Sequence, residues 1–166
     1  MRIISLVGEH DTGKTTTLKK LILELCCNRS AIIQDVSNVG RYSTFITSKK
    51  VVSNPIENYI NQHLDVTIVV NYNGKRIGIT TVGDGWAFIK EQLNRMGSCD
   101  VVIFACHDTQ QVWDNMRAYI DAQGNCVTTV IQVLHKKCIT VRENPEFEKC
   151  CDCRNQMSIN EILSLL

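Results

Sequence analysis

The feature that most constrains the fold is a glycine-flanked segment, residues 8–15, with the sequence GEHDTGKT. The residues before it, 2–7, are mostly apolar, which predicts a buried strand. The residues after it, 15–26, repeat apolar positions at helical spacing and predict an amphipathic helix. Because Gly8 and Gly13 permit a sharp turn, the chain is expected to form a strand, a tight loop and a helix in that order.

The same segment carries the residue types that bind a polyphosphate. Glycines let backbone N–H groups point inward, and the following helix adds its positive end. We expect Lys14 to reach the β- and γ-phosphates, Thr15 to bind Mg²⁺ through its hydroxyl, and the lysine to face solvent otherwise. The predicted nucleotide contacts are Gly8, Glu9, His10, Asp11, Thr12, Gly13, Lys14, Thr15 and Thr16. The alternative is a structural glycine turn, which does not require the adjoining lysine and threonine.

Composition bounds the class of protein. The 166 residues, 44% hydrophobic and 21% charged, predict a single domain over residues 1–166. A net charge of +1 gives no general attraction to nucleic acid, so no nucleic-acid partner is implied. Apolar runs are too short for a membrane span or a signal peptide, and we therefore expect a cytoplasmic protein with no membrane partner. The nine cysteines are an odd number and favour reduced thiols.

The rest of the chain alternates between strand and helix patterns. Strands are predicted at residues 31–36, 65–72, 75–82, 101–106 and 127–134, and helices at 56–64, 86–96, 110–122 and 159–166. Residues 37–54 are polar and predict a loop. Asn73 and Gly74 favour a type I′ turn, so the two strands around them should form an antiparallel hairpin. Ser158 is expected to open the terminal helix as part of a capping box.

This alternation predicts an α/β fold of three layers, with a mainly parallel sheet covered on both faces and one antiparallel hairpin strand. Ligands of such folds bind at the carboxyl ends of the strands. Polar residues follow the apolar runs at these ends, namely Gly8, Asp35, Gly83, Asp84, His107, Asp108 and His135.

Residues 8–15 fit the pattern G-x-x-x-x-G-K-[ST], and on this motif the chain resembles the P-loop NTPase superfamily. The resemblance implies a P-loop NTPase fold that binds a nucleoside triphosphate with Mg²⁺. The order of strand, loop, helix, polar loop, hairpin and glycine turn looks like that of small GTPases. Two motifs depart from them, because Thr80 stands where D-x-x-G has its acid and HKKC at 135–138 replaces the guanine-reading N-K-x-D. We therefore expect ATP rather than GTP, as in a small bacterial-type P-loop protein.

Two acids are predicted to join Lys14 as catalytic groups. Asp84 lies between two glycines just past a predicted strand and is the candidate for the magnesium site with Thr15. Its alternative role is a turn aspartate that binds its own backbone. Asp35 resembles the acid found beyond the second strand of small P-loop kinases, where it lies near the acceptor or the metal. A turn or helix-capping role is its alternative.

A second constellation has the spacing of a zinc site. His135 and Cys138 precede Cys150 and Cys153, and two such pairs would supply four tetrahedral ligands in a Cys/His-rich excursion over residues 135–153. Free thiols without metal are the favoured alternative.

These features predict Mg²⁺-dependent binding of ATP, or of another nucleoside triphosphate, with hydrolysis or phosphoryl transfer to a small acceptor. The alternatives are a regulatory nucleotide-dependent switch that binds a protein partner, and a module that binds nucleotide without hydrolysing it.

Overall fold

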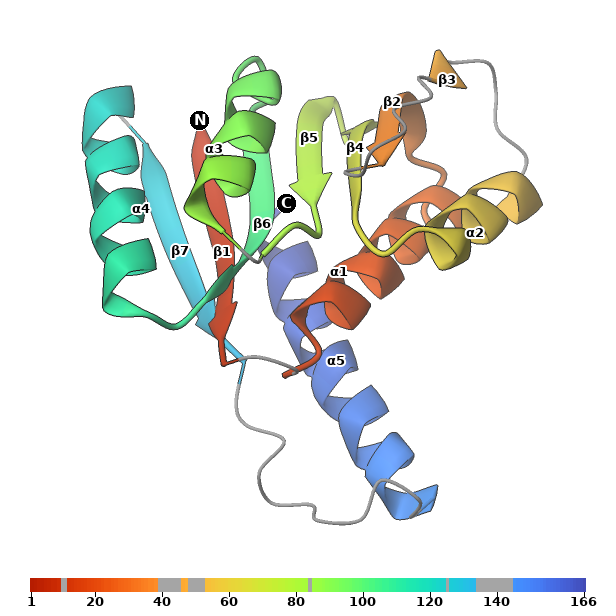
Figure 1. Cartoon of the computed structure of the whole chain (residues 1–166). Coiled ribbons are helices and arrows are strands. Elements are labelled where there is room, and N and C mark those ends of the chain that lie inside the picture. Colours follow the sequence, from red (N-terminus) through yellow and green to blue (C-terminus); the bar gives the residue numbers. More distant parts are fainter. Residues whose placement is uncertain (10–11, 39–45, 48–52, 84, 125, 134–144) are drawn as a thin grey trace.

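The computed structural model describes residues 1–9, 12–38, 46–47, 53–83, 85–124, 126–133 and 145–166. It is an α/β protein in which helices cover a seven-stranded sheet (Figure 1). The strands are β1 (Arg2–Gly8), β2 (Ile32–Asn38), β3 (Ile46–Thr47), β4 (Val66–Tyr72), β5 (Lys75–Thr80), β6 (Val101–His107) and β7 (Val127–Gln132). The helices are α1 (Lys14–Leu23), η1 (Glu24–Asn28), α2 (Ser53–Gln62), α3 (Trp86–Arg95), α4 (Gln110–Gln123) and α5 (Pro145–Leu165).

The sheet has the order β3-β2-β4-β5-β6-β1-β7. Strands β5, β6, β1 and β7 are parallel, whereas β4 is antiparallel to both β5 and β2. β3 is antiparallel to β2 and lies within the residues predicted as a loop. Two strands, β3 and β4, therefore run opposite to the others, whereas one such strand was expected. The strands β1, β2, β5, β6 and β7 therefore end at one edge, here called the carboxyl edge, and β4 begins there.

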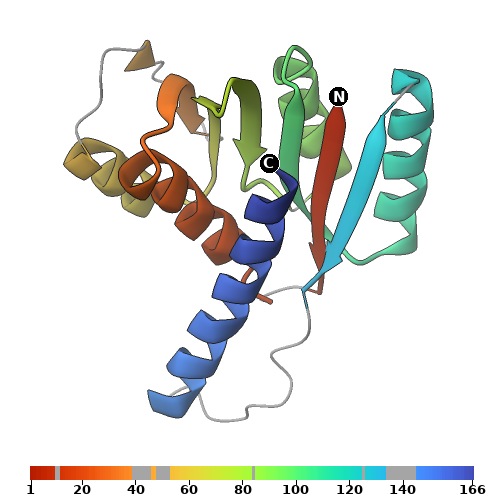
Figure 2. The same ribbon diagram turned by 180° about the vertical axis from the view of Figure 1, so that it is seen from behind.

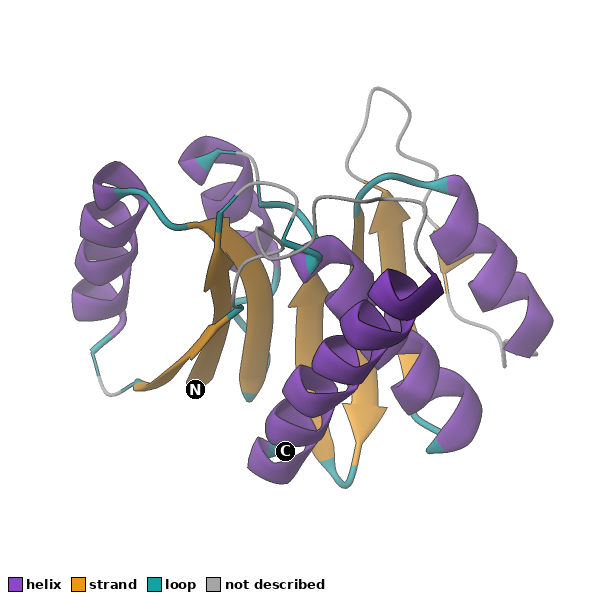
Figure 3. Ribbon diagram, turned by 90° about the horizontal axis from the view of Figure 1, so that it is seen from below, coloured by secondary structure: helices purple, strands orange, loops and turns teal. Residues whose placement is uncertain are grey.

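The alternation of buried side chains along β1 divides the core into two layers. Ile4 and Leu6 face a cluster that includes residues of α1, α2 and α5, whereas Ile3 and Val7 face a cluster that includes residues of α3 and α4. Helices lie on both sides of the sheet (Figure 3). The three-layer prediction is compatible with this arrangement, in which burial of both faces explains why the central strands β1 and β6 are almost continuously apolar.

The predicted hairpin is confirmed. β4 and β5 pair antiparallel with Tyr72 opposite Lys75. Asn73 and Gly74 between them have φ angles of 50° and 74°. Positive φ at both positions is what a type I′ turn requires, and asparagine and glycine tolerate it best.

The prediction of a short terminal helix was wrong. α5 begins at Pro145, and Ser158 lies inside it rather than at its start. Residues 146–158 contain neither glycine nor proline, and a proline at the first helical position favours an early start. The amino-terminal part of α5 extends past the sheet, as seen from both sides in Figures 1 and 2. No helix among the described residues, α5 included, has the length and apolar character needed to cross a membrane.

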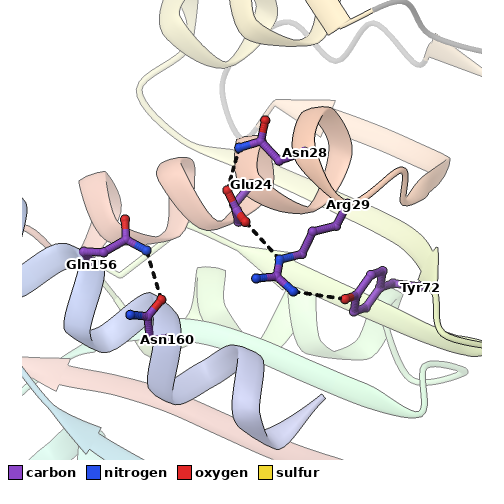
Figure 4. Close-up of polar contacts among 6 residues, drawn as sticks. All are labelled: Glu24, Asn28, Arg29, Tyr72, Gln156 and Asn160. Carbon is purple, nitrogen blue, oxygen red and sulfur yellow. Dashed lines mark hydrogen bonds and ion pairs between the residues drawn. The ribbon is translucent and has the colours of Figure 1, made fainter.

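The far end of α1 changes to a π-helix, η1, where the sequence predicted a continuous α-helix. The Glu24 carboxylate accepts hydrogen bonds from Asn28 Nδ2 at 2.6 Å and Arg29 Nε at 2.9 Å. Arg29 also donates to the Tyr72 hydroxyl of β4, at 3.4 Å (Figure 4). Figure 4 shows a separate contact on α5, from Gln156 to Asn160. Hydrogen bonds between the protein's own side chains thus occupy this end of α1.

Candidate functional site

The predicted site lies at the carboxyl edge, where β1 leads into residues 8–15, here called the GKT loop. Gly8 pairs with His107 at the ends of β1 and β6. A Cβ atom on Gly8 would lie 2.8 Å from Thr12 Oγ1 and 2.9 Å from the Val133 carbonyl oxygen, so no larger residue fits. Gly13 has a φ of 90°, which disfavours any residue with a side chain. Both glycines are therefore required by the backbone path.

Lys14 is buried rather than solvent-facing, with 6% of its surface exposed. Its ammonium group donates to the carbonyl oxygens of Gly8 at 2.8 Å and Glu9 at 2.6 Å, and lies 3.3 Å from Thr12 Oγ1. The expectation of a solvated lysine was wrong because the loop curls around its own backbone acceptors. The cation is thus held inside the GKT loop.

Among the described residues, no side chain caps the amino end of α1, which is here called open. Its N-cap is Gly13, which supplies no side-chain cap, and no acidic residue lies in the first turn. The first N–H groups of any helix lack acceptors within the helix, so this end carries partial positive charge. Lys14 and Thr15 occupy the first turn, and Thr16 is exposed beside them. Backbone donors and one side-chain cation therefore meet at the same place.

A buried contact supports α1 from behind. The Thr17 hydroxyl lies 2.9 Å from Asn155 Oδ1 of α5, and Asn155 is only 8% exposed. One turn further, Lys20 and Asp152 form an ion pair at 2.5 Å. Sequence reasoning missed Asn155, because an asparagine inside a helix carries no signal of its partner. α5 thus fixes the position of the helix that follows the loop.

Thr80, which stands in the place of the expected acid, takes part in a buried hydrogen-bond network. Its hydroxyl lies 2.8 Å from the Thr67 hydroxyl, which in turn lies 3.0 Å from Gln92 Oε1 of α3. All three residues are buried. The next residue, Thr81, accepts a hydrogen bond from the Thr15 hydroxyl through its carbonyl oxygen, at 3.5 Å.

The neighbouring end of β6 is closed by its own side chains. The Asp108 N–H donates to the Gly8 carbonyl oxygen at 3.2 Å, and the Asp108 carboxylate accepts from Trp113 Nε1 at 2.8 Å. Thr109 is the N-cap of α4, and its hydroxyl accepts from the Val112 N–H. Asp108 therefore has a structural role here, while His107 lies half-buried beside the GKT loop.

Cys106 lies under the loop and is 1% exposed. Burial raises the pKa of its thiol to about 12, although the nearby Lys14 ammonium acts in the opposite direction. The thiol is therefore protonated at neutral pH and behaves as a small apolar residue.

The prediction that Asp35 ends its strand was wrong. It lies in the middle of β2, where it pairs with Val69. When the register is followed from Val69 across β4, β5 and β6, Asp35 lies at the same height along the strands as Ile3 of β1. Gly8 lies about 17 Å further along, at roughly 3.3 Å per residue, and β4, β5 and β6 separate the two strands. Asp35 is therefore remote from the GKT loop.

Several predicted residues lie outside the described part of the chain: His10, Asp11, Asp84, His135 and Cys138. Their predicted roles stay predictions. Cys150 and Cys153 lie on α5, not in an irregular excursion, and Cys153 is exposed. Within the described residues, histidine, cysteine and acidic side chains form no group of three or more that could hold a metal ion.

Comparison of the chain with protein-family models, with curated proteins and with solved structures found no match.

Proposed function

We propose that the protein binds a nucleoside triphosphate, with ATP preferred, at the GKT loop. The observation that carries this proposal is the open amino end of α1, where an uncapped helix start and the Lys14 ammonium face the same short loop. A helix start of this kind attracts anions, and a cation beside it adds to the attraction. No carboxylate lies in the first turn of α1 to compete for these donors.

Binding would exchange one set of acceptors for another. The Lys14 ammonium now donates to two loop carbonyl oxygens, and phosphate oxygens carry more negative charge than a carbonyl. A triphosphate would therefore draw the ammonium from these carbonyls toward the β- and γ-phosphates. Gly8 and Gly13 place no side chain at their two positions in the loop.

The residues present fit a magnesium ion, which the proposed reaction requires. Thr15 offers a hydroxyl oxygen at the helix start, and hard cations prefer such oxygen ligands. Bound beside the phosphates, Mg²⁺ would neutralise their charge. Asp84 stays the predicted acid of the reaction.

The reaction we propose is hydrolysis of the γ-phosphate or its transfer to a small acceptor. Phosphoryl transfer depends mainly on alignment and charge stabilisation, so the required protein groups are few. Lys14 would stabilise the charge that spreads over the transferred group. His107 lies next to the start of the loop, at a position suited to contact the attacking group.

A module that binds nucleotide without hydrolysing it is the second candidate. The buried network around Thr80 favours it, because that position supplies a hydroxyl engaged with Thr67 instead of an acid. Nucleotide affinity without turnover would identify this case.

The decisive experiment is calorimetric titration of the protein with ATP, GTP and their diphosphates in Mg²⁺. Phosphate release is then measured with and without a panel of nucleosides and small hydroxylated metabolites. The proposal requires saturable triphosphate binding, with ATP tighter than GTP. The absence of binding by any of these nucleotides would refute it.

A further inference from the structure

Thr81 connects the GKT loop to an acid that the sequence did not single out. Its carbonyl oxygen accepts from the Thr15 hydroxyl at 3.5 Å, and its own hydroxyl donates to Asp65 Oδ1 at 3.0 Å. The backbone on either side is fixed as well, because Thr81 N–H donates to the Val66 carbonyl oxygen and Val66 N–H donates to Thr81 Oγ1, each at 2.9 Å. Asp65 is thus held within two hydrogen bonds of Thr15.

A second contact brings the same segment to α1. Lys19 lies four residues after Thr15 and hence on the same face of the helix. Its ammonium group donates to the His63 carbonyl oxygen at 2.6 Å. The connection from α2 to β4, which contains His63 and Asp65, therefore runs along the face of α1 that carries Thr15. Figure 1 shows this connection passing close to α1.

We propose that Asp65 is the carboxylate that binds the magnesium ion, directly or through its water ligands, at Thr15. This inference rests on the proposed function and names a residue of that site. Asp65 comes directly before β4, and an antiparallel strand begins where its parallel neighbours end. The topology therefore brings the start of β4 to the carboxyl edge, beside the end of β5.

The chemistry of the two side chains suits this role. A hydroxyl and a single carboxylate, completed by phosphate oxygens and water, form a common protein contribution to a Mg²⁺ site. Asp65 is only half-buried. Thr80 is fully buried in the network described above and presents no acid to the loop. Asp65 supplies the negative charge that the Thr80 position lacks.

A purely structural role is the competing explanation, in which Asp65 only accepts the hydrogen bond from Thr81. Asp65→Asn separates the two roles, because asparagine keeps an oxygen acceptor for Thr81 but loses the charge. Asp121→Asn is the matched control, since Asp121 is exposed on α4.

The test is calorimetric titration of each variant with ATP, once with Mg²⁺ and once with EDTA. We expect Asp65→Asn to lose at least tenfold in affinity with Mg²⁺, to match the parent protein in EDTA and to keep its Tm. Asp121→Asn should match the parent throughout. Mn²⁺ electron paramagnetic resonance of the ADP complex gives a second readout, in which the fraction of bound Mn²⁺ should fall for Asp65→Asn only.

Parent-like Mg²⁺ stimulation in Asp65→Asn would overturn the inference while leaving the proposed function intact, as would loss of that stimulation in Asp84→Asn alone. A parent protein that binds no ATP under either condition would overturn both. If Asp65→Asn unfolds, Asp65→Glu takes its place. A changed ratio of Mn²⁺ to Mg²⁺ affinity in this variant supports the metal role, and an unchanged ratio opposes it.

Discussion

Two helices begin at the carboxyl edge on opposite faces of the sheet, α1 after β1 and α4 after β6, and their amino ends differ. α4 is capped by the Thr109 hydroxyl, and Asp108 before it accepts from the Trp113 indole and donates its N–H to the Gly8 carbonyl oxygen. α1 begins at Gly13, has no side-chain cap, and contains Lys14 as the cation of its loop. Neighbouring strands of the same sheet thus lead into one helix start with a side-chain cap and one without.

The difference teaches that strand order alone does not make a binding site. Both helix starts have the same direction and the same partial charge. The Thr109 hydroxyl at the α4 start supplies an acceptor from the chain itself, whereas Gly13 at the α1 start supplies no side-chain acceptor. Each prediction below tests whether the open end binds and the closed end only stabilises.

The largest effect is expected for Lys14→Met, which removes the cation of the open end but keeps most of the apolar stem. ATP affinity should fall by at least about 100-fold, equivalent to roughly 2.7 kcal/mol, because charge-assisted contacts to the phosphates are lost. The Tm should fall by less than about 4 °C, because methionine fills most of the volume of the buried lysine side chain. Calorimetry and thermal unfolding measure the two quantities.

Lys90→Met serves as the control for this variant, because Lys90 is exposed on α3 and its loss removes the same charge from the protein. It should bind ATP as the parent does. Equal losses in both variants would mean that net charge, and not the open helix end, determines affinity.

The amino end of a third helix tests whether the difference between capped and uncapped helix ends extends beyond α1 and α4. α3 begins at Gly85 and, like α1, has no side-chain cap. Asp84 directly precedes it, outside the described residues. If this end belongs to the site, Asp84→Asn should lower turnover at least tenfold, about 1.4 kcal/mol of barrier, with a smaller effect on ATP affinity.

Phosphate-release assays measure this effect, with Asp35→Asn as the comparison. Asp35 lies in the middle of β2 and should leave turnover unchanged. Parent-like turnover in Asp84→Asn together with an inactive Asp35→Asn would reverse the assignment of the acid.

Much of the fold was predictable because strand and helix periods are local properties. The hairpin at Asn73 and Gly74 and the helix following Gly13 could be located from residue types alone. The full length of α5 could not be predicted, because Ser158 begins a capping-box pattern that indicates a helix start, whereas the helix already contains this residue. The antiparallel strand β3 was not predicted, because a strand of two residues is too short to show an alternation of polar and apolar side chains.

The site was less predictable, because its contacts join distant parts of the chain. The glycines and Lys14 were found from their spacing, but the burial of Lys14 depends on how the loop carbonyls turn. Asp65 reaches Thr81 only through the β4–β5 register. A search of strand ends selects Asp35 and overlooks an acid at the start of an antiparallel strand.

A smaller effect is expected for Thr109→Ala at the closed end. Loss of an N-cap hydroxyl costs about 1 kcal/mol of unfolding free energy, which lowers the Tm by roughly 2–4 °C for a chain of this size. ATP affinity should not change, because this helix start has no proposed ligand. Thermal unfolding and calorimetry on the same sample test both statements, and a loss of ATP affinity would contradict the separation of the two ends.

The smallest effect is expected at the far end of α1, which is also closed by side chains. The Asn28 amide, followed by Arg29, lowers the pKa of the Glu24 carboxyl group by hydrogen bonding. A carboxyl group with a lowered pKa stabilises the fold above its ordinary pKa, and this contribution is lost as the pH falls through the lowered value. Since the contacts are solvent-exposed, Glu24→Gln should lower the Tm by less than about 2 °C at pH 7. The difference from the parent should shrink as the pH falls below the ordinary carboxyl pKa and vanish below the lowered value. A Tm difference that persists in acid would show that Glu24 acts through packing instead of charge.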